Sequence, residues 1–220
     1  MITQIYEVSN AAEATICVEA GVDHVGVLVG DGSFPRELSP QAARRLFDGL
    51  PDGVIGSALS LSADRALIEA IIDVVSPPLL HLGAAPEALG LDVVREVKAA
   101  HPQLRLMRSI PVVDESAVAL AQSYDGVADF LLLDSHTPGD KQIGALGITH
   151  NWDISRQIVE AVNIPCILAG GLGPANVTAA IQAVGPAGVD SKTRTDCDCS
   201  HEKDPDKVWA FVREALASLS

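Results

Sequence analysis

The stretch Ile164-Pro-Cys-Ile-Leu-Ala-Gly-Gly-Leu-Gly-Pro-Ala-Asn-Val177 carries the pattern on which the fold prediction depends. Its opening apolar run is too short for a helix and is flanked by proline and glycine, which is typical of a buried strand. Gly170 and Gly171 follow where the backbone has to turn, and Gly173-Pro174 then predicts a helix with proline at its first position. Residues 187–190 form a second short apolar run. A glycine pair facing a helix N-terminus offers main-chain N–H groups to an anion, most often a phosphate, although such a pair also serves as a plain tight turn.

The same strand–loop–helix unit repeats about eight times along the chain. The predicted strands cover residues 2–6, 24–29, 54–59, 79–82, 104–109, 130–134, 164–169 and 187–190. Helices are predicted over residues 10–20, 63–75, 91–100, 115–123, 153–162, 173–184 and 205–219, and a further helix is predicted to begin at Ser39-Pro40. Such alternation predicts a parallel sheet. Eight units in 220 residues fit a single-domain α/β fold, a closed (β/α)8 TIM barrel over residues 1–220, better than the alternative of an open doubly wound sheet.

Capping residues support the helix predictions. Asn10 precedes the first helix and Gly21 ends it, while Ser39-Pro40 has the cap-then-proline order of a helix start. The last helix is expected to turn four apolar side chains inward at helical spacing: Val208, Phe211, Val212 and Leu216.

Composition excludes several classes of function. The net charge is −14, a field that repels nucleic acid and anionic membranes, and aromatic residues at 4% leave no platform for stacking bases. No apolar run approaches the ~18 residues that span a bilayer. The N-terminus has neither a basic region nor an apolar signal core, and four cysteines form no disulfide framework, so we expect a cytoplasmic protein, either a monomer or a homodimer.

The polar side chains at the carboxyl ends of the strands are the candidates for chemistry, because active sites of this barrel lie there. They are Tyr6, Glu7, Arg36, His81, Arg108, Asp134, His136, Asp190, Lys192, Thr193 and Arg194. Four of them are cations on one rim of an acidic chain, which predicts an anionic small-molecule substrate.

Three segments give the chain a family resemblance. Leu131-Leu132-Leu133-Asp134-Ser135-His136-Thr137-Pro138, the spacing Gly144…Gly147…Thr149…Trp152, and 169–177 with Gly188-Val189-Asp190 resemble phosphoribosylanthranilate isomerases. Arg36-Glu37-Leu38-Ser39-Pro40 is similar to the second loop and helix of that family.

The resemblance implies an Amadori rearrangement of an aminoaldose phosphate to an aminoketose in tryptophan synthesis, without metal or cofactor. It implies that Asp134 is the general acid, that Arg36 meets the anthranilate carboxylate, and that the phosphate lies between Gly170, Gly171 and the loop after the eighth strand, where Lys192, Thr193 and Arg194 stand. Tyr6, His81, Arg108, His136 and Asp190 are expected to contact the substrate.

The departures from the family pattern concern the base and the phosphate site. Tyr6 stands where the family has its catalytic cysteine, and a tyrosine with a pKa near 10 is a poor base. Glu7 has a suitable group, but successive strand residues face opposite ways, so it serves as base only if the chain turns after Tyr6. Lys192-Thr193-Arg194 replaces a Ser-Ser-Gly phosphate cradle, and Ile148 replaces a lysine.

Other interpretations remain open at this point. Arg108 and Asp190 are as compatible with an ion pair inside the barrel as with ligand binding. A barrel that only binds a phosphorylated metabolite is the main alternative to an isomerase. A metal-dependent sugar-phosphate epimerase is another, with Glu7, His81, Asp134, His136 and Asp190 as ligands. The cluster from Asp196 through Cys197 and Cys199 to His201 is interpreted as a solvated loop.

Overall fold

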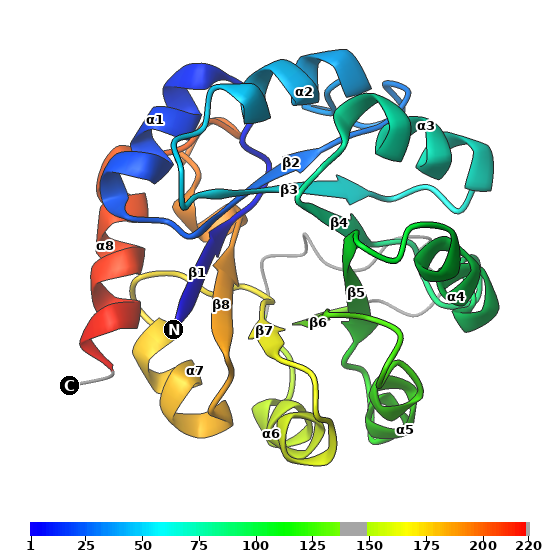
Figure 1. The fold of residues 1–220 in the computed structure, drawn as a ribbon. Helices are drawn as coiled ribbons and strands as arrows, with labels where there is room; N and C mark the ends of the chain where they lie inside the picture. The colour runs from blue at the N-terminus through cyan, green and yellow to red at the C-terminus, as the bar shows by residue number, and fades with distance from the viewer. Residues whose placement is uncertain (137–148, 219–220) are drawn as a thin grey trace.

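The structure, a computed structural model, describes residues 1–136 and 149–218. Within these ranges eight parallel strands pair in chain order and close into a barrel, because β8 also pairs with β1 (Figure 1). The strands are β1 (Ile2–Ile5), β2 (His24–Leu28), β3 (Ile55–Ser60), β4 (Leu79–Leu82), β5 (Arg105–Pro111), β6 (Phe130–Asp134), β7 (Cys166–Leu168) and β8 (Gly188–Ser191). The predicted (β/α)8 barrel is confirmed.

Helices surround the barrel and alternate with its strands (Figure 1). They are α1 (Ala11–Ala20), α2 (Pro40–Asp48), α3 (Arg65–Val75), α4 (Leu91–Ala100), α5 (Ser116–Ser123), α6 (Trp152–Ala161), α7 (Val177–Val184) and α8 (Pro205–Ala217), with a short 3-10 helix, η1 (Thr193–Thr195), after β8. The predicted caps form: Asn10 accepts a hydrogen bond from the Glu13 N–H, Gly21 is left-handed, and Ser39 caps α2. None of the helices that the structure describes is long and apolar enough to cross a membrane.

Two helix details differ from the prediction. Helix α7 begins at Val177, not at Gly173-Pro174. The Asn176 side chain accepts from the Gly173 N–H at 2.8 Å and donates to the Gly171 carbonyl at 3.2 Å, which holds this segment as a turn. In α8 the expected burial of Leu216 is wrong, since it is 46% exposed. Ala215 is buried instead, because it follows Val208 by seven residues and so stays on the same stripe.

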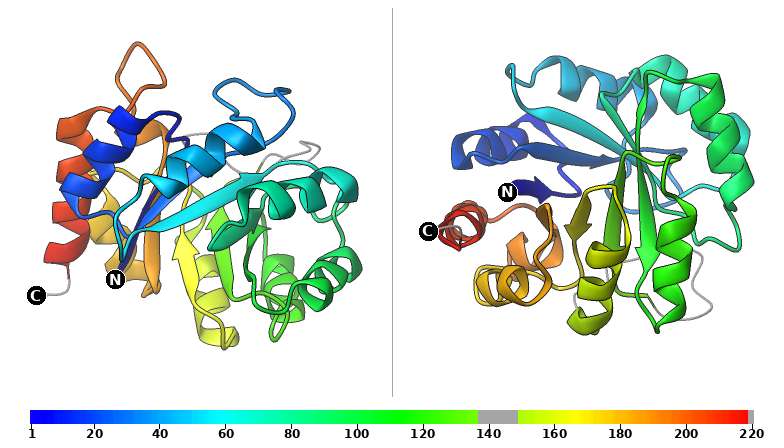
Figure 2. Two further views of the ribbon diagram at one scale, coloured as in Figure 1. Left: turned by 45° about the horizontal axis from the view of Figure 1, so that its top comes forward. Right: turned by 60° about the horizontal axis from the view of Figure 1, so that its bottom comes forward.

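The core has two layers. One lies between strands and helices, and the other fills the barrel with the side chains of Tyr6, Leu79, Met107, Leu132, Ile167 and Ala169. Because side chains alternate along a strand, the neighbours of each inward residue point to the helices. The loops that follow the strands therefore extend from one end of the barrel, as Figure 2 shows for the segment after β2 and the segment between β8 and α8.

This alternation corrects the prediction for Arg108. Its neighbour Ser109 faces the barrel interior, so Arg108 points outward and is fully buried under the helices. Its guanidinium donates to main-chain carbonyls of the segment that leads from β4 to α4: Leu82 and Ala84 at 2.7 Å and Leu89 at 3.2 Å. Arg108 thus does not line the pocket, and within the described residues it makes no ion pair with Asp190. It holds the β4–α4 segment in place instead.

Candidate active site

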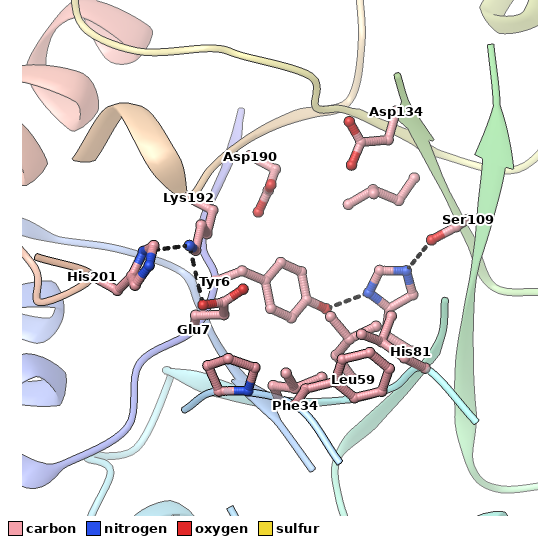
Figure 3. A pocket seen from close by; sticks show the side chains of 14 residues that line it. Tyr6, Glu7, Phe34, Leu59, His81, Ser109, Asp134, Asp190, Lys192 and His201 are labelled. Carbon is pink, nitrogen blue, oxygen red and sulfur yellow. Dashed lines mark hydrogen bonds and ion pairs between the residues drawn. The ribbon is translucent and has the colours of Figure 1, made fainter. Parts of the chain in front are cut away.

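A pocket of about 190 Å³ opens at the carboxyl ends of the strands (Figure 3). One wall is apolar and comes from the ends of β2 and β3 with the loops that follow them; the other wall is charged. The lining residues are Tyr6, Glu7, Leu28, Phe34, Pro35, Leu59, Leu61, His81, Ser109, Leu132, Asp134, Asp190, Lys192 and His201. A pocket with one apolar and one ionic wall fits a small molecule that has both characters.

Tyr6 and His81 form the polar part of the pocket floor. The Tyr6 hydroxyl lies 2.6 Å from His81 Nδ1, and His81 Nε2 lies 2.7 Å from the Ser109 hydroxyl (Figure 3). The Tyr6 hydroxyl also lies 2.8 Å from the Ser57 hydroxyl. Burial raises the pKa of Tyr6 well above 10 and lowers the pKa of His81 to about 3. Both rings are therefore neutral at neutral pH, and the Tyr6 phenol is no general base.

The Tyr6 ring fits because residue 26 has no side chain. A Cβ atom on Gly26 would lie 2.1 Å from Tyr6 Cδ1, so alanine there would require the ring to move. The ring consequently packs directly on the main chain of β2. Glycine in the middle of a strand often marks such a close approach.

Asp134 and Asp190 place two carboxyl groups in the pocket. Burial raises the pKa of Asp134 to about 7, although the Ser135 N–H donates to its Oδ1 at 2.7 Å. Burial, and then the nearby charge of Asp134, raise the pKa of Asp190 to about 8 against a 3.2 Å hydrogen bond from Gln4 Nε2. Neutral pH therefore leaves a proton on these carboxyl groups for transfer to a bound molecule.

The chain turns after Tyr6, which is the condition under which Glu7 could face the pocket. Strand β1 ends at Ile5, and Glu7 has a φ of +59°, a left-handed conformation that non-glycine residues rarely adopt. This turn brings the carboxylate into the pocket that Tyr6 also lines, where its Oε2 lies 3.2 Å from Lys192 Nζ (Figure 3). The chain thus presents two successive side chains to one pocket.

Lys192 connects the pocket to the segment after β8. Its ammonium lies 3.3 Å from Asp196 Oδ2 and 3.3 Å from His201 Nδ1. Asp196 in turn pairs with the fully buried ammonium of Lys203 at 2.5 Å. Lys192 is thereby held at the pocket rim between Glu7 and Asp196.

Arg36 does not line the pocket. Its Nη2 lies 2.6 Å from Glu13 Oε2 and donates to the Glu7 carbonyl at 2.9 Å. Its Nε is buried without a hydrogen-bond partner among the described residues, so the guanidinium keeps a donor for the substrate carboxylate that the family resemblance assigns to it.

The expected phosphate ligands are divided between two further cavities that share Gly171 and Thr193. A small one of about 30 Å³ is lined by Asp134, Gly170, Gly171, Leu172, Asp190, Ser191, Lys192 and Thr193. A larger one of about 770 Å³ is lined by Gly171, Gly173, Pro174, Ala175, Asn176, Thr193, Arg194, Asp196, Cys197, Asp198, Ser200, His201 and Lys207. The main-chain N–H groups of residues 170–172 have no acceptor among the described residues.

Several residues that the sequence analysis names do not line this site or lie outside the described part of the chain. His136 lines none of these three cavities. Thr137, Pro138, Gly144, Gly147 and Ile148 fall outside the described residues. In the described part of the chain, no group of three or more His, Cys, Asp and Glu residues is arranged to hold a metal ion.

Sequence reasoning missed the hydroxyls of Ser57 and Ser109 and the apolar wall. Ser57 bonds Tyr6 at the floor, and Ser109 lines the pocket. The signal was available: counting every second residue along the predicted third and fifth strands places Ser57 and Ser109 on the inward face.

A closed parallel barrel with buried carboxyl groups at the carboxyl ends of its strands defines the class of (β/α)8-barrel enzymes. The family model "N-(5'phosphoribosyl)anthranilate (PRA) isomerase" matches residues 86–214. The chain belongs to this family.

Similar proteins and solved structures support this family assignment. The N-(5'-phosphoribosyl)anthranilate isomerase of Methanocella arvoryzae is 32% identical over 203 residues, covering 92% of both chains. That of Haloferax volcanii is 36% identical over 199 residues, covering 89% of this chain and 84% of the relative. The crystal structure of phosphoribosyl anthranilate isomerase from Thermotoga maritima is 25% identical with a TM-score of 0.79, covering 99% of this chain and 100% of that one.

Proposed function

We propose that this chain is an aldose–ketose isomerase that converts N-(5'-phosphoribosyl)anthranilate into its aminoketose isomer, with Asp134 as general acid and Glu7 as general base. The observation that carries the proposal is the left-handed turn at Glu7. It directs a carboxylate into the pocket that also holds the Asp134 carboxyl group. The two groups are suited to opposite tasks, because Asp134 has a raised pKa and Glu7 faces a lysine ammonium.

The reaction requires one proton donor and one proton acceptor. Asp134 protonates the ring oxygen of the furanose, the bond from C1 to that oxygen breaks, and the anthranilate nitrogen forms a C1=N iminium. Glu7 then removes the proton from C2, and the electron pair moves to give an enol that carries the amine. Return of this proton from Glu7 to C1 and transfer of the enol proton to Asp134 complete the ketose and restore both carboxyl groups. Each step moves a proton between the substrate and a carboxyl group.

The pocket walls fit the two ends of such a substrate. The apolar wall of Leu28, Phe34, Leu59 and Leu61 suits the aromatic ring. The phosphate is assigned to the larger cavity beside Gly171, Thr193 and Arg194, because the cavity of about 30 Å³ has room for only about one or two water molecules. A phosphorylated small molecule is therefore the partner that we assign to this chain.

The test is turnover by the purified full chain and growth of a tryptophan auxotroph that lacks this isomerase. We expect the wild type to convert N-(5'-phosphoribosyl)anthranilate and to restore growth, with turnover that declines above about pH 7 as Asp134 loses its proton. Asp134→Asn and Glu7→Gln are each expected to lower kcat by about 10²–10⁴-fold.

Glu19→Gln is the matched control, since Glu19 is exposed on α1. Turnover of both pocket variants at the rate of this control would contradict the assignment. Binding of the substrate without turnover by the wild type would indicate a non-catalytic barrel instead.

A further inference from the structure

Four polar side chains at the floor of the pocket form one continuous chain of hydrogen bonds. The Tyr6 hydroxyl lies between the Ser57 hydroxyl of β3 and Nδ1 of His81 on β4. Nε2 of the same ring contacts the Ser109 hydroxyl of β5, as Figure 3 shows. All four side chains belong to residues that are at most 4% exposed. Because buried polar hydrogens require acceptors, the direction in which the protons point along this chain is constrained.

The charge states of the two rings fix the number of protons in the chain. Burial raises the pKa of Tyr6 well above 10, so the phenol keeps its proton. Burial, and then the charge of Arg108, lower the pKa of His81 to about 3, so the imidazole is neutral. A neutral imidazole donates from one nitrogen and accepts at the other. Only two arrangements therefore satisfy all three contacts, and they run in opposite directions.

The two directions differ in where the last proton falls. In the first, Ser57 donates to Tyr6 and Tyr6 donates to His81 Nδ1. His81 Nε2–H then donates to the Ser109 oxygen, so the Ser109 proton is left over. In the second, every bond is reversed and the Ser57 proton is left over. Ser57 is fully buried, does not line the pocket and makes no other hydrogen bond among the described residues, whereas Ser109 lines the pocket. A buried hydroxyl proton without an acceptor is costly, which selects the first direction.

We propose that Ser109 binds the substrate, by donating a hydrogen bond from its hydroxyl to an acceptor oxygen of the molecule in the pocket. The Ser109 oxygen already accepts from His81, and no group among the described residues accepts its proton. A donor held in this way favours a ligand with an oxygen at that place over one with an apolar group. The inference rests on the proposed function, because the acceptor is either the anthranilate carboxylate or a sugar oxygen of that substrate.

The tautomer of His81 tests the direction of the chain without any substitution. In the ¹⁵N-labelled full chain, two-bond ¹H–¹⁵N correlation spectra distinguish a protonated ring nitrogen from a bare one. We expect a proton on Nε2 and none on Nδ1 at pH 7. Tyr6→Phe is expected to keep this tautomer, because Nε2–H retains Ser109 as acceptor whereas Nδ1–H would have none among the described residues. A proton on Nδ1 in the wild type would mean that Ser109 donates to the ring, and would overturn the inference.

Binding of the aminoketose product tests the hydroxyl itself. Ser109→Ala is expected to raise the Kd of the product in calorimetry, and the KM of the substrate, about tenfold, with kcat within about threefold of wild type. Ser123→Ala is the matched control, since the Ser123 hydroxyl donates to the Leu120 carbonyl within α5. Its Kd should stay within about twofold of wild type. Equal Kd values in all three proteins, or a lower kcat in Ser109→Ala with Kd unchanged, would overturn the assignment.

A second measurement on the wild type covers the case in which Ser109→Ala does not fold. Saturating product should shift the His81 Nε2–H resonance, because the Ser109 oxygen becomes a stronger acceptor when its own proton is donated. The ring signals of His101, which lies at the end of α4 and pairs with Glu69, should not move. An unshifted His81 resonance at saturation would overturn the inference.

The aniline analogue of the product, which lacks the carboxylate, identifies the acceptor. A tenfold difference between wild type and Ser109→Ala that persists with this analogue assigns the hydrogen bond to a sugar oxygen. A difference that disappears assigns it to the carboxylate, and both results support the role of Ser109. Failure of the wild type to bind the product would instead remove the proposed function, and the tautomer of His81 would still report the direction of the chain.

Discussion

At the scale of single residues, Tyr6 and Glu7 show how adjacent side chains acquire different tasks from different surroundings. Tyr6 stands where the family pattern has a cysteine, and its phenol is buried between Ser57 and His81. Glu7 is partly exposed to the pocket and faces Lys192. The floor of the pocket thus carries a phenol at the position where the family pattern has a thiol, and the turn supplies a carboxylate beside it.

Tyr6→Phe tests whether the phenol is structural. The variant keeps the ring on Gly26 but removes the hydroxyl that bridges Ser57 and His81, so two buried polar groups lose a partner. We expect the free energy of unfolding in urea to fall by about 1–3 kcal/mol, with kcat/KM within about threefold of wild type. A fall in turnover of more than 100-fold in a folded variant would show that the phenol takes part in the chemistry.

Asp190 predicts how stability depends on pH. Its pKa is about 8 in the folded chain against an ordinary 3.8, so the folded state binds more protons between these values. Its contribution to stability is therefore lost as pH rises from about 4 to 8. Asp190→Asn is expected to raise the free energy of unfolding at pH 8.5 by at least about 1 kcal/mol, a gain that shrinks toward pH 5. Asp48→Asn, at an exposed site, serves as control; equal gains at both pH values would contradict the burial argument.

At the scale of elements, the β7–α7 turn lies between the cavity proposed for the phosphate and Asp134. Gly170 has a φ of +81°, and a Cβ atom there would lie 2.8 Å from His150 Nδ1 and 3.3 Å from Asp134 Oδ1. The turn is thus tightly packed against the acid that it adjoins. A glycine is required here both for the backbone conformation and for space.

Gly170→Ala should separate these two requirements when it is compared with Gly185→Ala. Gly185, the C-cap of α7, has a φ of +66° but nothing within 4 Å of the added Cβ. We expect Gly185→Ala to lower stability by about 1 kcal/mol with normal turnover, because only backbone strain is added. Gly170→Ala should also reduce kcat at least tenfold, because its Cβ displaces the groups around Asp134. Thermal unfolding and turnover of both variants test this prediction. Equal turnover in Gly170→Ala and Gly185→Ala would contradict a steric effect on Asp134.

The helices and strands could be predicted from the sequence because their ends depend on residues that are close together in the chain. Much of the site could not, because its geometry depends on contacts between segments that are far apart in the chain. Asn10, Gly21 and Ser39 act within one turn of chain, so the helix ends that they mark are confirmed. Strand alternation places Asp134 and His81 inward but places Arg108 outward, a consequence that requires the strand register. The carbonyl of the left-handed residue Glu7 accepts a hydrogen bond from a guanidinium 29 residues away, a contact that no local pattern reveals.

At the scale of the whole molecule, the sequence contains 29 acidic and 15 basic side chains. Several of the bases are used inside the structure, as in the pairs of Lys203 with Asp196 and Arg36 with Glu13. Because each such pair uses one acid and one base, the excess of 14 acidic side chains is left without basic partners. Mutual repulsion of these charges opposes the compact state.

Salt is accordingly expected to stabilise the chain. Raising NaCl from 0.1 M to 1 M shortens the screening length from about 10 Å to about 3 Å, and Tm should rise by a few degrees. A triple variant with Glu19→Gln, Asp52→Asn and Asp73→Asn, which changes the net charge from −14 to −11, should start with a higher Tm and gain less from salt. Calorimetry of both proteins measures this, and an identical salt increment in the two would refute the repulsion argument.

The Tyr6 ring occupies the space that a side chain at position 26 would need, so the residues allowed at these two positions depend on each other. Any larger residue at position 26 closes the space that the Tyr6 ring occupies. A small residue at position 6 opens a void that only a second substitution can refill. Neither position can therefore be changed without a compensating change at the other.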